Sequence, residues 1–419
     1  MKEKQLLSLT ALLLVALLSL QLAGCAALAP SAEAANLMEN VTPNRGEATP
    51  VRQEDAAAAT DFALRLFRAG NDAGKNTLIA PVAVLSALAM TANGAGGETL
   101  AQMEQTLGMD RDRLNAFVYS YLEDHSKDGA MNVANSIWFK NDFGFKPDQS
   151  FLQTNADYFG ADLYQAPFNG ESVDKINQWV KEKTDGKIPQ IVERLPDTTV
   201  ICLVNALSFE AKWEEPYETS DVSSGPFFLE NGETCTVRFM ESTEYDYLED
   251  EKAVGFLKPY KGGKYAFVAL LPKEAGNLTE YVNSLQGAEL QKMISERSRE
   301  SVITRLPKFQ TSYDADLCDT MRAMGLELPF DGSRADFSGM GSWQSGNLSF
   351  EQMIHKSFIS VGEQGTRAGA ALLMSATLGA VFALPEYKKV DLDHPFVYML
   401  IDTETNLPFF IGTMLDPGK

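Results

Sequence analysis

One stretch near the C-terminus, from Glu363 to Pro385, constrains the possible folds more than any other part of the chain. After Arg367 it carries no charge until Glu386, and it consists mostly of Ala, Gly, Leu, Ser and Thr. It is short for a membrane span and too rich in Gly and Ala for a convincing one. A loop of this length would normally be polar, because connections run over the protein surface. We therefore predict a segment with two states, exposed in one and buried as a strand in the other.

The order of side chains within this stretch fits a β-strand. Successive residues of a strand face opposite sides of the sheet, and one face would carry only side chains that tolerate burial. That face comprises Thr366, Ala368, Ala370, Leu372, Met374 and Ala376. The other face comprises Arg367, Gly369, Ala371, Leu373, Ser375 and Thr377, with the single charge at its end. The alternation predicts that the segment can be inserted into a sheet.

Composition and charge limit the class of protein. The chain has 419 residues, of which 45% are hydrophobic, so it can bury a substantial core as one large domain or two ordinary ones. Its net charge of -21 argues against binding to nucleic acid and against direct adsorption to anionic lipid. Cys202, Cys235 and Cys318 are too few and too widely spaced for a disulfide framework or a metal site, so we expect structural buried thiols.

The N-terminus has the layout of a bacterial export signal. Lys2 and Lys4 precede an apolar run from Leu6 to Leu20. The sequence Leu22-Ala23-Gly24-Cys25 then looks like a lipobox, in which the cysteine is lipidated and becomes the mature N-terminus. A plain secretory peptide cleaved near Ala27 to Ala29 is the alternative. We expect a signal peptide over residues 1–24 and a secreted protein, anchored to the outside of the bacterial cell membrane only through lipid on Cys25.

The remaining chain is expected to form a flexible tether over residues 25–55 and one α+β domain over residues 56–419. The tether contains three prolines and little apolar periodicity. In the domain, apolar runs predict strands, an Asn-Gly pair predicts a hairpin, and apolar spacing predicts helices. The strands are Val200–Phe209, Tyr265–Leu271, Val302–Leu306, Phe358–Val361 and Phe396–Ile401; the hairpin turn is Asn231-Gly232; the helices include Leu278–Ile294 and Ala315–Met324.

Several motifs of this domain resemble the serpin family, in family order. They are Gly94–Thr99 after a helix that starts at Pro81, Ala134–Phe139, Phe151, Tyr158–Ala161, Ile176–Val180, Thr184–Ile188, Val204–Leu207, Lys212-Trp213, Ala335–Gly339, His355-Lys356, His394–Phe396 and Ile411-Gly412. The resemblance extends from about Ala56 to the end of the chain. It implies the serpin fold, with a large mixed central β-sheet, additional sheets, about eight to nine helices and an exposed reactive loop.

The resemblance also assigns residues to the region where the central sheet opens. Pro81, Asn205, Trp213 and His355 match this region, and His355 corresponds to the buried histidine that holds the sheet closed near Asn205. Ala80 and Ala83 stand where the family often has serines, so the hydrogen bonds of those hydroxyl groups are absent. Each such bond is worth about 1 kcal/mol net, and its loss could change how readily the sheet opens.

Enzyme motifs are missing from the sequence. It contains three histidines, His125, His355 and His394, and no GxSxG elbow, HExxH motif or paired Cys or His spacing. We expect His125 to be a solvated surface residue and His394 to have a role at the start of a strand. An enzyme, a cofactor and a metal are therefore not expected, and the function must be recognition.

The function implied by the resemblance is that of a suicide substrate. A serine protease cleaves the loop and forms a covalent acyl complex, the loop inserts into the main sheet, and the protease is trapped. Hinge residues of inhibitory serpins are matched by Glu363, Gly365, Thr366, Ala368, Gly369, Ala370 and Ala371. Small side chains there suit rapid insertion. A monomer is expected. The alternative is a non-inhibitory, surface-tethered binding protein with the serpin fold.

The family register places the reactive bond between Gly379 and Ala380. The segment is a few residues longer than in many members, so Leu378, Val381 and Phe382 are alternative positions. No Lys or Arg lies between Arg367 and Lys388, which argues against trypsin-like proteases that need a cation in their specificity pocket. Small and medium apolar residues instead favour elastase-like or subtilisin-like proteases, and cleavage after Leu378 or Phe382 would suit chymotrypsin-like enzymes.

Overall fold

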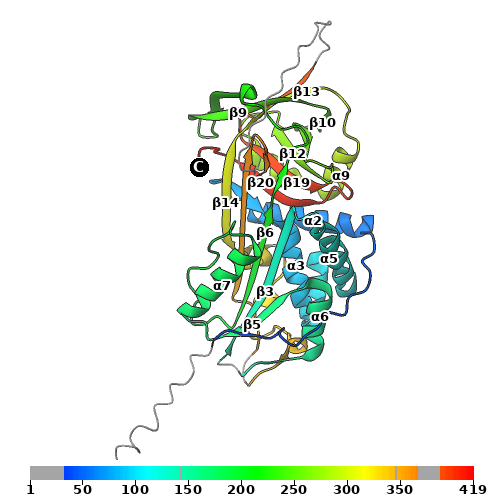
Figure 1. Cartoon of the computed structure of the whole chain (residues 1–419), viewed down its shortest axis with the longest axis vertical. Helices are drawn as coiled ribbons and strands as arrows, with labels where there is room; N and C mark the ends of the chain where they lie inside the picture. Colours follow the sequence, from blue (N-terminus) through cyan, green and yellow to red (C-terminus); the bar gives the residue numbers. More distant parts are fainter. Residues whose placement is uncertain (1–32, 142–143, 345–346, 367–386) are drawn as a thin grey trace, which may run out of the picture.

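The structure, a computed structural model, describes residues 33–141, 144–344, 347–366 and 387–419 (Figure 1). Its described part contains nine α-helices. They are α2 (Gln53–Gly70), α3 (Pro81–Ala92), α4 (Gly97–Leu107), α5 (Arg111–Ser126), α6 (Gln149–Phe159), α7 (Gly170–Lys183), α8 (Leu278–Ser284), α9 (Gly287–Ser295) and α10 (Cys318–Ala323). Figure 1 shows an elongated molecule with most of the longer helices in its lower half. This α+β architecture agrees with the predicted fold class.

The largest sheet, here called sheet A, is mixed. Its order is β1-β5-β3-β6-β16-β17-β7, and β14 also pairs with β16. Strands β3 and β6 are antiparallel, whereas β6 and β16 are parallel. The bounds are β1 (Ala35–Asn36), β3 (Met131–Lys140), β5 (Asp162–Ala166), β6 (Ile201–Phe209), β7 (Ala211–Lys212), β14 (Phe309–Asp316), β16 (Gln352–Gly362) and β17 (Gly365–Thr366).

Strand β6 is buried along its whole length because helices cover both faces of sheet A. Leu203 and Leu207 belong to the main core together with residues of α3. Val204 and Ala206 belong to a second core together with Ile176 of α7. Alternate side chains of one strand therefore pack into two different cores. This explains why the sequence of β6 is apolar except for a single Asn and a single Ser.

Two further large sheets form the upper half of the molecule (Figure 1). Sheet B has the order β10-β11-β12-β19-β20-β2, and sheet C has the order β18-β13-β9-β8. The strands of sheet B are β10 (Asp246–Glu249), β11 (Ala253–Pro259), β12 (Tyr265–Pro272), β19 (Phe396–Asp402), β20 (Pro408–Met414) and β2 (Thr77–Ile79). Those of sheet C are β18 (Lys388–Asp391), β13 (Val302–Pro307), β9 (Thr234–Glu244) and β8 (Val222–Phe228). A small sheet pairs β15 (Gly341–Ser342) with β4 (Lys146–Pro147).

Most predicted strands are found near their predicted bounds, and the predicted hairpin joins β8 to β9, with Gly232 at a φ of 83° in the turn. Two predicted helices differ. The helix predicted over Leu278–Ile294 is two helices, because the chain is extended at Leu285. The helix predicted from Ala315 starts only at Cys318, because the ladder between β14 and β16 continues to Asp316. Tertiary pairing overrides local helical spacing at that end.

The described part of the predicted tether lies against the domain. Strand β1 pairs with β5 at the edge of sheet A, and Leu37, Met38 and Val41 pack against the main core. The tether prediction is therefore wrong for these residues, because short apolar side chains between the prolines supply contacts that a purely flexible segment lacks. Residues 1–32, with the predicted signal peptide and Cys25, lie outside the described residues. None of the helices in the described ranges is long and apolar enough to cross a membrane.

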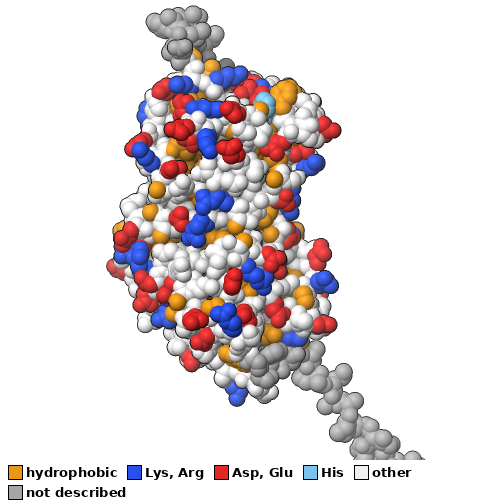
Figure 2. Space-filling model, turned by 180° about the vertical axis from the view of Figure 1, so that it is seen from behind, with side chains coloured by type: hydrophobic (Ala, Val, Ile, Leu, Met, Phe, Trp, Pro, Cys, Tyr) orange, Lys and Arg blue, Asp and Glu red, His pale blue; other side chains and the backbone are white. Residues whose placement is uncertain are grey.

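The charges of the surface are mixed. Figure 2 shows the face opposite to that of Figure 1, where Lys and Arg side chains alternate with Asp and Glu side chains. Across the described residues of this face there is no continuous basic surface of the kind that follows a nucleic-acid backbone.

Candidate functional site

The start of the predicted two-state segment is already part of sheet A. Gly365 and Thr366 form β17, which pairs with β16 on one side and with β7 on the other. Gly365 has a φ of 146°, and an added Cβ would lie 2.1 Å from the carbonyl oxygen of Ala211. Only glycine fits this position without strain. The two residues therefore lie in sheet A between β16 and β7.

The side chain of Thr366 is anchored inside the protein. Thr366 is 1% exposed, and its hydroxyl group lies 2.5 Å from the hydroxyl group of the fully buried Tyr260. The Tyr260 ring stacks on the ring of Trp213, with centroids 4.5 Å apart and an interplanar angle of 14°. Burial raises the pKa of Tyr260 far above its ordinary value, so the phenol is neutral and can donate this hydrogen bond. The contact fixes where the hinge begins.

Three N–H groups hold the residues just before Thr366. The backbone N–H of Trp213 donates to the carbonyl oxygen of Gln364 at 3.0 Å, and its indole N–H donates to that of Gly362 at 2.9 Å. The backbone N–H of Tyr217 donates to the carbonyl oxygen of Glu363 at 2.9 Å. We call these two residues and their three donors the aromatic clamp. The clamp keeps the chain reversal between β16 and β17 in place.

An ion pair closes the same region from the outside. The Lys308 ammonium group lies 2.6 Å from the Glu363 carboxylate, and each side chain is 29% exposed. Partial burial acts to raise the pKa of Glu363, but the hydrogen bond from Lys308, a backbone hydrogen bond and nearby positive charges outweigh it, so the pKa is lowered. Glu363 is therefore ionised and paired at neutral pH.

A second group of predicted residues lies lower in sheet A, between β6 and β16. The ring of His355 lies 2.8 Å from Asn205 through Nδ1, and its Nε2 accepts a hydrogen bond from the backbone N–H of Ala80 at 3.2 Å. Asn205 in turn donates to Asn135 at 2.6 Å. Ala80 directly precedes Pro81, the first residue of α3. The network connects three neighbouring strands to the helix behind them.

Burial controls the charge of His355. The residue is fully buried, and desolvation lowers its pKa from 6.5 to about 3. The neutral ring carries its proton on Nδ1, because Nε2 must accept from Ala80. A second proton on Nε2 would remove that acceptor and place a positive charge in the core. The contact between β16 and α3 therefore requires the neutral form.

The structure thus arranges the predicted residues in two clusters on one sheet. Glu363, Gly365, Thr366 and Trp213 lie at the upper end, and Pro81, Asn205 and His355 lie in the middle. The other predicted residues lie outside the described residues: Cys25, the hinge residues Ala368, Gly369, Ala370 and Ala371, and the reactive bond at Gly379 and Ala380 with its alternatives Leu378, Val381 and Phe382.

Sequence reasoning missed part of the upper cluster. Tyr260 and Tyr217 were not singled out, because one lies in a turn between β11 and β12 and the other in a loop before β8. Nothing in their sequence neighbourhoods relates them to a segment more than a hundred residues away. An indirect signal was present at Tyr260, since a large aromatic residue directly before Lys261-Gly262-Gly263 must be placed by tertiary contacts.

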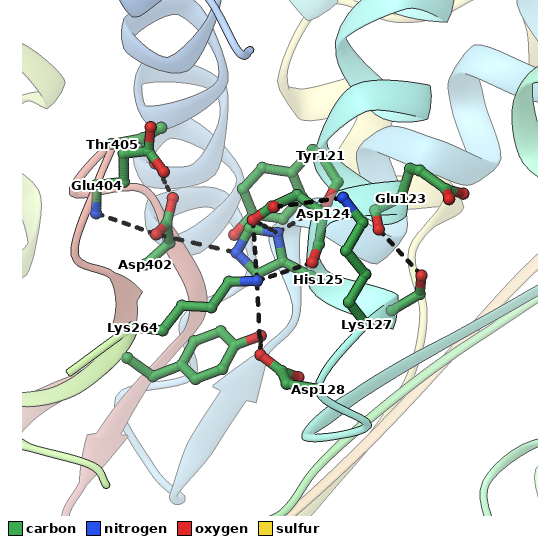
Figure 3. A network of polar contacts seen from close by, with 12 residues as sticks. Tyr121, Glu123, Asp124, His125, Lys127, Asp128, Lys264, Asp402, Glu404 and Thr405 are labelled. Atoms are coloured by element: carbon green, nitrogen blue, oxygen red, sulfur yellow. Dashed lines mark hydrogen bonds and ion pairs between the residues drawn. The ribbon is translucent and has the colours of Figure 1, made fainter. Parts of the chain in front are cut away.

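The prediction for His125 is wrong. The residue is 3% exposed, its ring stacks on that of Tyr121 at 4.0 Å, and its Nε2 lies 3.9 Å from a carboxylate oxygen of Asp402 (Figure 3). Burial lowers its pKa, so the ring is neutral. The signal was the four-residue spacing from Tyr121, which puts both rings on one helix face. The polar neighbour Asp124 lies 3.8 Å from Nδ1 of His125 and pairs with Lys264 at 2.9 Å.

The other polar residues have structural environments. His394 lies 2.6 Å from Asp393 and stacks on Phe228. Cys202 and Cys318 are buried as predicted, whereas Cys235 is half-buried. Within the described ranges no group of three His, Cys, Asp or Glu residues is arranged to hold a metal ion.

Comparisons with known proteins agree with this geometry. A family model described as serpin (serine protease inhibitor) matches residues 57–417. Leukocyte elastase inhibitor A of Mus musculus is 33% identical, with 86% of this chain and 99% of that protein covered. An uncharacterized serpin-like protein of Thermococcus kodakarensis is 30% identical, with 86% and 85% covered. The crystal structure of the thermophilic serpin tengpin in its native state matches with a TM-score of 0.87 and 39% identity, covering 92% of this chain and 100% of that one.

The lowered pKa of His355 predicts an acid-sensitive sheet. Between pH 6.5 and about pH 3 the unfolded chain binds a proton that the folded chain does not, so this stability is complete above pH 6.5 and is lost as the pH falls toward 3. Each pH unit in this range lowers the free energy of unfolding by up to about 1.4 kcal/mol. Urea unfolding should show a smaller decrease in the free energy of unfolding between pH 8 and pH 4 for His355→Gln than for the wild type. The decrease that remains in the variant includes the contribution of His125. An equal decrease in the two proteins would contradict the prediction.

Proposed function

Because the chain belongs to the serpin family, we propose that it is an inhibitor that acts as a suicide substrate of an elastase-like or subtilisin-like serine protease. Members of this family are typically protein inhibitors of proteases and not enzymes. The finer proposal concerns the mechanism and the target. It rests on the hinge, on the composition of residues 367–386 and on the absence of basic residues between Arg367 and Lys388.

The observation that carries the proposal is the position of β17. Gly365 and Thr366 lie between β16 and β7, and the ladder between β16 and β6 runs only from Gln352 to Ser357. Beyond Ser357, Val361 and Gly362 pair with β17 instead. A strand that continues from Thr366 would separate β16 from β6 residue by residue and would replace the contact between Asn205 and His355.

The proposed reaction begins as ordinary proteolysis. The protease serine attacks the carbonyl carbon of Gly379, and the bond to the nitrogen of Ala380 breaks. The serine oxygen keeps the acyl group as an ester, and the proton of the serine hydroxyl passes through the histidine of the protease to the leaving nitrogen. The new amine of Ala380 leaves with the C-terminal part. The released N-terminal part can then enter sheet A behind Thr366 and carry the esterified protease with it, before water cleaves the ester. Fast entry is what separates an inhibitor from a substrate.

Small apolar residues around Gly379 support an elastase-like or subtilisin-like target. Such residues suit small or shallow specificity pockets, whereas an acidic pocket needs a cation that residues 368–387 lack. The similarity to leukocyte elastase inhibitor A of Mus musculus supports the elastase-like class. The natural partner is proposed only as a class of protease, bound by a monomer.

The direct test is formation of a covalent complex. Incubation with a pancreatic-type elastase should give a band on denaturing gels at the summed mass of the protease and the inhibitor without its C-terminal peptide. Mass spectrometry should find that peptide beginning at Ala380, or one to three residues away if an alternative bond is used. Cleavage with full turnover and no complex would contradict inhibition and would favour the non-inhibitory binding protein.

A hinge variant provides the matched comparison. Thr366 is buried, so Thr366→Arg places a charge where β17 is enclosed by the sheet and should block further insertion. The loop should still be cleaved at the same bond, but complexes should be replaced by cleaved inhibitor. Thr234→Arg, at an exposed position of β9, should leave the yield of complex unchanged. Equal yields for all three proteins would show that insertion at the hinge is not required.

We further propose that the domain of residues 56–419 is held outside the bacterial membrane by lipid on Cys25, after removal of residues 1–24. The lipobox-like sequence supports this localisation. Expression in a bacterial host that processes lipoproteins should give a mature protein in the membrane fraction whose N-terminal peptide is an acylated Cys25. Cys25→Ser should release it. An unmodified N-terminus near Ala27 to Ala29 would identify a plain secretory peptide.

A further inference from the structure

A buried ion pair lies behind the aromatic clamp and has no part in the mechanism derived so far. The ammonium group of Lys258, at the end of β11, lies 2.6 Å from a carboxylate oxygen of Glu244, at the end of β9. Their side chains are 2% and 8% exposed. A buried pair of this kind costs desolvation energy and is weak evidence for stability as such. Its location therefore needs another explanation.

The carboxylate is fixed by further hydrogen bonds. The hydroxyl group of Ser242 donates to the same Glu244 oxygen at 2.5 Å and lies 3.0 Å from the hydroxyl group of Thr304 on β13. Glu244 itself pairs with Val302 across sheet C. The negative partner thus belongs to sheet C and is held from two strands, while the positive partner belongs to sheet B. The pair fixes how these two sheets meet.

The ammonium group of Lys258 also contacts both rings of the aromatic clamp. It lies 4.4 Å from the ring centroid of Tyr217 and 5.6 Å from that of Trp213. A buried cation this close to an aromatic ring is attracted to the face of the ring. Lys258 is two residues before Tyr260, whose ring stacks on Trp213 and whose hydroxyl group bonds Thr366. One cation therefore contacts both residues that donate to the hinge carbonyls. Its own strand, β11, leads to Tyr260, which binds the side chain of Thr366.

We infer that Lys258, held by Glu244, is a positioning residue for loop insertion. Its ammonium group orients Trp213 and Tyr217 so that their N–H groups hold residues 362–364 in register, and the new strand is then guided into sheet A from a fixed starting point. The consequence for protease trapping rests on the proposed function. The order of the clamp does not rest on it and can be measured without a protease.

The first measurement is amide hydrogen exchange of the peptide that contains Trp213 and Tyr217. These two amides should be protected in the wild type, because they donate to the carbonyl oxygens of Gln364 and Glu363. In Lys258→Met their exchange should be at least about tenfold faster, as expected when a local opening becomes more favourable by a tenfold change in its equilibrium constant. Unchanged protection would overturn the inference.

A double variant separates positioning from stability. Lys258→Met leaves the charge of Glu244 buried without its partner, which could destabilise the whole domain. Combining it with Glu244→Gln removes that charge and should restore the overall unfolding midpoint, while the clamp, still without its cation, should keep exchanging fast. Recovery of protection in the double variant would show that Lys258 acts only through stability and would overturn the positioning role.

An ion pair far from the hinge, with a buried carboxylate but a more exposed cation, serves as the control. Arg113 of α5 lies 2.5 Å from the buried carboxylate of Asp55. Arg113→Met should lower the unfolding midpoint without changing exchange at Trp213 and Tyr217. With elastase, Lys258→Met should consume more inhibitor per protease trapped than Arg113→Met does, at an unchanged rate of cleavage. Absence of any complex in the wild type would contradict the proposed function, whereas the exchange result would still decide the inference.

Discussion

The incomplete pairing of β6 with β16 is the constraint on which the rest of the structure depends. The two strands are joined from Gln352 to Ser357, and above this point β17 lies beside β16. A sheet that is closed below and already occupied by a short strand above can be extended by a strand that starts at Thr366. Under the proposed inhibitory function, it must also resist this extension until the loop is cut. The two clusters described above meet these opposite requirements.

In the proposed mechanism, the lower cluster resists opening of the sheet and the upper cluster directs it. His355, Asn205 and Ala80 join strands to a helix through hydrogen bonds that only the neutral imidazole can make. At the upper end, Tyr260, Trp213 and Tyr217 bind the backbone and side chain of the hinge. Each hydrogen bond contributes about 1 kcal/mol net, so the barrier to opening is the sum of many modest contacts.

Much of this arrangement could be predicted from the sequence. The motif at His355 led to the lower cluster, and Glu363, Gly365 and Thr366 could be located because they are nearly consecutive. The alternation and the hinge residues after Thr366 lie outside the described residues and stay predictions. Tyr217, Tyr260 and Lys258 could not be located, since they come from different strands and loops and look ordinary in their own neighbourhoods. The same reason explains the errors at His125 and Ala315, where tertiary contacts override local polarity and spacing.

The central claim is that the native fold holds a place for a further strand and is metastable until that strand is supplied. Thermal unfolding followed by circular dichroism, before and after cleavage within residues 367–386 by a catalytic amount of thermolysin, a zinc protease that forms no acyl-enzyme, tests it most directly. Insertion adds a full set of strand hydrogen bonds and buried side chains to sheet A, so the cleaved protein should unfold at a much higher temperature than the intact one. An equal or lower unfolding temperature after cleavage would contradict the account.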